Sequence, residues 1–143
     1  MIIIHPYAKP LINGKRNPKN YPHWVKLISL IKEPIVQIGV EGESQLVPDF
    51  RTNLSMDELK SLISECRLWI GVDSFFQHLA WICNKPGIVL WSVSDPLIFG
   101  HKENINLLAD RKNLAPNQFL WWDLTEYDAD KFVTPEEVIK YIC

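Results

Sequence analysis

Short apolar runs alternate with amphipathic segments along most of the 143-residue chain. The apolar runs predict strands over 1–4, 35–40, 67–72, 88–91 and 105–109, with a short edge strand near 46–50. The amphipathic segments predict helices over 24–31, 55–66, 73–84 and 138–142. Because the strands are almost wholly apolar, both faces of their sheet should be covered by helices. The pattern predicts an α/β fold, a Rossmann-like doubly wound parallel sheet in a single domain over residues 1–143.

Two helix starts are marked by their own capping residues. Ser55 is followed three residues later by Glu58, which is the spacing of a capping box. Thr134 is followed by Pro135, a residue that favours the first helical turn, and by Glu137 at the third position. These signals fix where the second and the last helix should begin.

The strongest candidate site lies where the strand over 67–72 passes directly into a helix. The first-turn amides of such a helix face the ligand edge of the sheet and attract an anion such as a phosphate. Ser74 is placed to cap this helix, and His78, four residues on, shares a face with it. An alternative stays open, in which Asp73 and Ser74 only cap the helix and His78 only bonds a nearby carbonyl. The side chains expected to face the sheet are Phe75, Leu79 and Ile82.

Two further strand ends carry charge. Glu41 and Glu43 follow the second strand, where a carboxylate can accept hydrogen bonds from ribose or sugar hydroxyls. The long polar loop over 6–22, which follows the first strand, holds four cations able to clamp a pyrophosphate. These cations are Lys9, Lys15, Arg16 and Lys19. A solvated acidic turn and a solvated basic loop are the competing interpretations.

The composition argues against nucleic acid as the main partner and against a membrane-spanning segment. A net charge of −2 argues against a surface built for nucleic acid, and no apolar run reaches the roughly 18 residues of a membrane span. The opening residues 1–9 lack the features of a signal peptide. Cys66, Cys83 and Cys143 are widely spaced, as expected for reduced thiols in a cytoplasmic protein.

Several catalytic motifs are missing from the sequence. The four histidines show no H-x-x-x-H spacing, so no metal site is expected, and no cofactor is implied. Neither G-x-S-x-G nor G-x-G-x-x-G nor a P-loop motif is present. Trp121 and Trp122 are interpreted as packing anchors or as part of an interface.

The residues from Leu54 to Gly100 resemble the C-terminal half of glycosyltransferase family 9, the heptosyltransferase-type enzymes of GT-B fold. The opening strand, the Lys15-Arg16-Asn17-Pro18 segment and the closing Thr134–Val138 segment resemble the same family. The matching positions are Leu54, Glu58-Leu59, Asp73-Ser74, His78-Leu79-Ala80, Pro86 and Ser94-Asp95-Pro96.

The resemblance implies a domain that binds a nucleotide-diphosphate sugar, with an ADP-sugar favoured, by a metal-independent mechanism. Asp73 would meet the sugar, while Ser74 and the amide of Phe75 would meet the pyrophosphate. His78 would support the helix start, Lys15 would approach the phosphate or sugar, and Glu43 would bind the ribose. Ser94 and Asp95, from the matching S-D-P loop, complete the expected donor-binding set.

Two departures from the family pattern bear on this assignment. The family has glycine where this chain has Phe75, which either leaves the phosphate-binding amide free or blocks it. The family has tryptophan where this chain has Asn17. The acceptor-binding domain, which carries the catalytic base in the family, is not recognised, so no catalytic residue is assigned.

Three functional hypotheses follow. The first is a glycosyltransferase-like donor domain that needs an acceptor-domain subunit or a second copy of itself for transfer. The second is a non-catalytic module that retains the fold and binds a nucleotide or a protein. The third is a fragment without a ligand.

Overall fold

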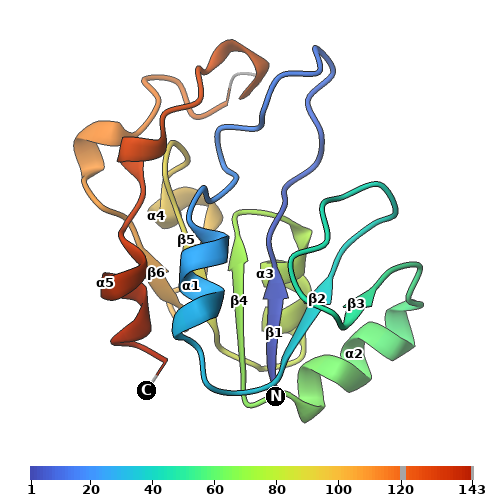
Figure 1. The fold of residues 1–143 in the computed structure, drawn as a ribbon. Coiled ribbons are helices and arrows are strands. Elements are labelled where there is room, and N and C mark those ends of the chain that lie inside the picture. The colour runs from blue at the N-terminus through green and yellow to red at the C-terminus, as the bar shows by residue number, and fades with distance from the viewer. Residues whose placement is uncertain (120–121, 143) are drawn as a thin grey trace.

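The computed structural model describes residues 1–119 and 122–142, and within them the strands form one parallel six-stranded sheet (Figure 1). The strands are β1 (Ile2–His5), β2 (Ile35–Ile38), β3 (Phe50–Arg51), β4 (Leu68–Val72), β5 (Ile88–Leu90) and β6 (Ile105–Leu107). Their order, β3-β2-β1-β4-β5-β6, is that of the doubly wound nucleotide-binding sheets. The predicted Rossmann-like fold class is therefore confirmed.

Helices cover both faces of the sheet (Figure 1). They are α1 (Trp24–Leu30), α2 (Met56–Glu65), α3 (Phe75–Ile82), α4 (Pro96–Phe99) and α5 (Pro135–Ile139). Three short 3₁₀ helices follow β6, at Arg111–Asn113, Trp122–Leu124 and Ala129–Lys131. None of the helices in the described residues is long and apolar enough to cross a membrane.

The apolar strand side chains divide between two cores. Ile2 and Ile4 of β1 join the core beneath α1 and α5, whereas Ile3 between them joins the core beneath α2 and α3. This alternation explains why the strands read as continuous apolar runs, since each face of the sheet needs its own buried row. The two central strands β1 and β4 lie side by side in register, with Ile4 opposite Ile70.

Both predicted capping arrangements are confirmed. The Ser55 hydroxyl accepts a hydrogen bond from the Glu58 amide at 3.1 Å, and the Glu58 carboxylate accepts one from the Ser55 amide at 3.4 Å. The Thr134 hydroxyl accepts a hydrogen bond from the Glu137 amide at 3.2 Å, with Pro135 in the first turn. Each start fixes the direction in which its helix leaves the preceding loop.

The edge strand lies further along the chain than expected. Residues 46–49 form no strand. The Gln37 side chain binds the backbone at the start of this segment, because it donates to the Ser44 carbonyl and accepts from the Leu46 amide. Pairing with β2 begins only at Phe50. The helix α4 was not predicted, since four residues are too few to show a helical period.

The expected sheet-facing side of α3 is wrong at Phe75 and Ile82 and confirmed at Leu79. Phe75 and Ile82 are exposed, and the buried side is formed by Phe76, Leu79 and Ala80. Two consecutive aromatic residues fit either face of the helix, so spacing alone selects the wrong one. Phe76 packs edge-on against the buried ring of Trp69, with centroids 5.5 Å apart.

Candidate functional site

A cavity of about 720 Å³ opens at the carboxyl ends of β1 and β4. From these two neighbouring strands the sheet continues in opposite directions, to β2 on one side and to β5 on the other. Ligands of doubly wound sheets bind at such a switch point. The lining residues are His5, Tyr7–Ile12, Asn17, Lys19, Val40, Glu43, Asp73–Phe75, Phe119, Trp122 and Asp123.

The first turn of α3 borders this cavity. Ser74 occupies the position before the helix in an extended conformation, with φ −157° and ψ −178°. Its hydroxyl makes no cap bond to the helix amides and instead lies 3.1 Å from Nδ1 of His5. The predicted helix start is confirmed, but the prediction that the Ser74 side chain caps it is wrong. The amides in the first turn of a helix have no backbone acceptor within that helix. In α3 the Ser74 side chain does not accept from them either.

His5 supports the floor of the cavity from the end of β1. Its ring stacks on Phe76 at a centroid distance of 5.1 Å and meets Phe75 edge-on at 5.5 Å. Only 6% of the residue is exposed, and this burial lowers the pKa of the imidazole from 6.5 to about 4. At neutral pH the ring is uncharged and stays within its aromatic surroundings.

Acid is expected to destabilise the chain through His5. The unfolded chain takes up a proton near pH 6.5, whereas the folded chain does so only near pH 4. The contribution of neutral His5 to the free energy of unfolding is thus fully present above pH 6.5. It is lost as the pH falls towards 4, by about 3 kcal/mol in total. Urea unfolding of the wild type and of His5→Leu, each at pH 6.5 and at pH 4, measures this loss of stability. Equal acid sensitivity in the two proteins would contradict it.

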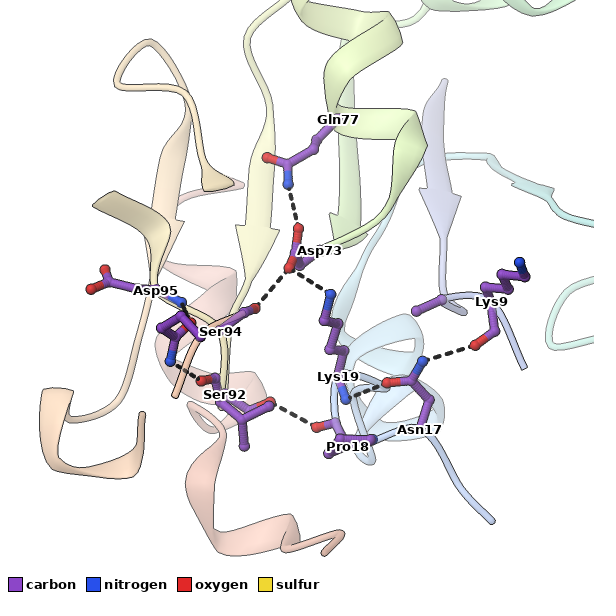
Figure 2. Close-up of polar contacts among 12 residues, drawn as sticks. Lys9, Asn17, Pro18, Lys19, Asp73, Gln77, Ser92, Ser94 and Asp95 are labelled. Atoms are coloured by element: carbon purple, nitrogen blue, oxygen red, sulfur yellow. Dashed lines mark hydrogen bonds and ion pairs between the residues drawn. The ribbon is translucent and has the colours of Figure 1, made fainter. Parts of the chain in front are cut away.

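The Asp73 carboxylate joins three segments of the chain (Figure 2). One oxygen accepts from Gln77 Nε2 of α3 at 2.8 Å. The other accepts from Ser94 Oγ, after β5, at 2.7 Å and lies 3.0 Å from Nζ of Lys19 in the loop after β1. Asp73 is buried, with 6% exposed. Its carboxylate therefore ties the three segments together beneath the cavity.

The loop after β1 is ordered by its own side chains (Figure 2). Asn17 donates to the Lys9 carbonyl at 2.8 Å and accepts from the Lys19 amide at 2.9 Å. Ser92, after β5, donates to the Pro18 carbonyl at 2.7 Å. Asn17 thus holds the loop in a fixed course along the cavity.

The four cations of this loop are placed differently. Lys9 and Lys19 line the cavity, whereas Lys15 and Arg16 do not. Lys19 lies over the Trp122 ring at 4.7 Å, and the Arg16 guanidinium covers the Tyr127 ring at 3.9 Å. The structure thus brings Lys9 and Lys19, rather than Lys15, to the cavity.

Glu43 lines the cavity from the turn after β2. One carboxylate oxygen accepts from the Val40 amide at 2.7 Å, and partial burial raises the pKa of the group. A Cβ at Gly39 would overlap this carboxylate, so the glycine makes room for it. Glu41 is exposed and outside the lining.

Three expected donor-binding residues act elsewhere in the structure. His78 is exposed and pairs with His101, with ring nitrogens 2.8 Å apart. Ser94 is engaged by Asp73. Asp95 accepts from the Leu97 amide at the start of α4 and pairs with Arg111 at 2.8 Å. None of these three side chains lines the cavity.

Aromatic side chains form much of the remaining wall. Phe75, whose residue is 53% exposed, lines the cavity without filling it, and Phe119 and Trp122 line it from the segment after β6. Trp121 lies outside the described residues. His5, Tyr7 and Phe119 were missed at the sequence level, because no local pattern links them to the cavity. The described residues hold no group of three or more side chains suited to a metal ion.

Comparison with known proteins identifies the family. Residues 45–119, just over half of the chain, match the model of glycosyltransferase family 9 (heptosyltransferase). The chain belongs to glycosyltransferase family 9. The matched segment of this family 9 chain includes β4, α3 and β5, and with them Asp73, Ser74 and Asp95. The resemblance read from the sequence is confirmed.

A solved structure supports the fold of the family 9 chain over almost its whole length. The ADP-heptose lps heptosyltransferase II of E. coli is similar, with a TM-score of 0.66 at 18% sequence identity. The similarity covers 99% of this chain and 44% of that one, so the family 9 chain spans less than half the length of the enzyme. A search of curated protein sequences gave no match.

Proposed function

We propose that this family 9 chain binds a nucleotide-diphosphate sugar in the cavity above β1 and β4. The observation that carries the proposal is the first turn of α3, which borders the cavity with no side-chain cap. Helix N-termini with free amides bind phosphates through hydrogen bonds and the helix dipole. The Ser74 hydroxyl is bonded to His5, so it does not compete for these amides.

The charges around the cavity suit the parts of such a ligand. Lys9 supplies a cation for the diphosphate, and Lys19 adds a second one beside Asp73. Glu43 has one carboxylate oxygen held by Val40, and its second oxygen would accept from the ribose hydroxyls. The aromatic walls would receive the base and the sugar. An ADP-sugar is the favoured donor.

Transfer of the sugar requires more than this cavity. The helix amides and the lysines would stabilise the departing diphosphate. A general base must also activate the acceptor hydroxyl, and a facing surface must position it. We propose that a separate acceptor domain or a second copy of the chain supplies both, and that the reaction takes place in the cytoplasm.

A non-catalytic nucleotide- or protein-binding module is the second candidate. Two observations favour it: the Asp73 carboxylate is already engaged by three partners, and the Phe75 ring stands beside the proposed phosphate position. Sugar transfer, or hydrolysis of the donor, by the isolated chain would contradict this candidate.

Calorimetric titration with ADP, UDP and GDP, each alone and as its sugar derivative, tests the proposal. We expect binding in these titrations. In a separate unfolding measurement, a ligand at a hundred times its Kd should add about 2.7 kcal/mol to the free energy of unfolding. Lys9→Met should weaken binding several-fold, whereas Lys102→Met, outside the cavity lining, should not. If the wild-type chain binds none of these nucleotides, the proposal fails.

A further inference from the structure

Phe75 is an exposed aromatic residue at the first position of α3. Phe75 is 53% exposed, whereas its neighbour Phe76 is buried in the core with 1% exposed. The side chain lines the cavity next to the amides proposed to hold the diphosphate.

The ring of Phe75 contacts the buried ring of His5. It meets the His5 ring edge-on, with an interplanar angle of 88° and centroids 5.5 Å apart. His5 is itself fixed by stacking on Phe76 at 5.1 Å and by its contact with Ser74 at 3.1 Å. The position of the Phe75 ring is therefore set by the fold before any ligand arrives, which limits the entropy lost on binding.

The chemistry of the ring determines which part of a ligand it favours. The face of an aromatic ring carries negative partial charge, so it offers nothing to the oxygens of a diphosphate. It attracts groups with positively polarised edges and apolar surface, such as the C–H groups on one face of a pyranose ring. Two groups flank the diphosphate of the donor, the ribose and the sugar. Because the ribose is assigned to Glu43, the sugar is the group left for the ring of Phe75.

We propose that Phe75 is a specificity-determining residue, against which the C–H face of the donor's pyranose ring packs. This inference rests on the proposed function. The packing would make the site prefer a nucleotide-diphosphate sugar over the free nucleoside diphosphate, since only the former carries this sugar.

Calorimetric titration of wild type and Phe75→Ala with ADP and with ADP-glucose tests the proposal, with UDP and UDP-glucose and with GDP and GDP-mannose as parallel pairs. Phe75→Ala should leave the Kd for the diphosphate within about twofold and weaken the matching sugar nucleotide about tenfold. Phe75→Tyr should retain the wild-type preference. Ile82→Ala, an exposed apolar residue of α3 away from the cavity lining, is the matched control and should change neither value.

The outcomes separate this inference from the proposed function. If Phe75→Ala weakens both ligands equally, or neither, the ring does not read the sugar and the inference fails alone. If Phe75→Ala strengthens binding of the sugar nucleotide, the ring obstructs the site, which also overturns the inference. If the wild-type chain binds no nucleotide, the proposed function fails and the inference fails with it.

Discussion

Replacing Asp73 with alanine is expected to lower the free energy of unfolding by about 3–5 kcal/mol, because it leaves Lys19 without its partner in a largely buried position. The Lys19 side chain is only 16% exposed. The substitution also removes the acceptor of Gln77 and Ser94, both of which are buried. Urea denaturation monitored by tryptophan fluorescence measures the loss.

The matched control is Asp49→Ala, which breaks an exposed ion pair with Arg51 and should cost at most about 1 kcal/mol. The double variant Asp73→Ala with Lys19→Met should recover part of the loss, because it removes the unpaired charge. A loss below about 1 kcal/mol for Asp73→Ala would contradict a structural role for the carboxylate in joining the three segments.

Replacing Phe75 with proline is expected to weaken nucleoside-diphosphate binding by about 10- to 100-fold. Proline lacks the backbone N–H, and a hydrogen bond to a charged group contributes about 1.5–3 kcal/mol. The first turn of a helix accepts proline readily. The extended conformation of Ser74 also suits a residue that precedes proline, so α3 should form normally.

Phe75→Ala is the control for this substitution, because it removes the same ring and keeps the amide. The difference in ADP affinity between Phe75→Pro and Phe75→Ala, measured by calorimetry, isolates the contribution of one N–H group. Circular dichroism checks that both variants keep their helix content. Equal affinity in the two variants would mean that this amide does not hold the diphosphate.

The parts of the fold that could be predicted are those determined by local sequence. Strands such as Leu68–Val72 are apolar on both faces, and helices such as Met56–Glu65 carry their own capping residues. The parallel, doubly wound sheet followed from the alternation of these elements. Element boundaries moved by one to four residues where a distant side chain intervened, as Gln37 does before β3.

The parts of the site that could not be predicted depend on contacts between distant residues. Asp73, which lines the cavity, also meets Lys19, which is far away in sequence, and this ion pair gives the expected sugar ligand a structural contact. Ser74 bonds to His5 instead of capping α3. No periodicity records such pairings. The choice of Lys9 and Lys19 over Lys15 likewise follows from the course of the loop rather than from its composition.

In the proposed complex, the first-turn amides of α3 receive the diphosphate of a nucleotide sugar. Titration of ¹⁵N-labelled chain with ADP-glucose, followed by amide chemical shifts, tests it most directly. We expect the largest changes at the amides of Ser74, Phe75 and Phe76, with smaller ones at Glu43. Changes confined to the groove around Trp81 and His101 on the outer side of α3, or no changes at saturating ligand, would contradict it.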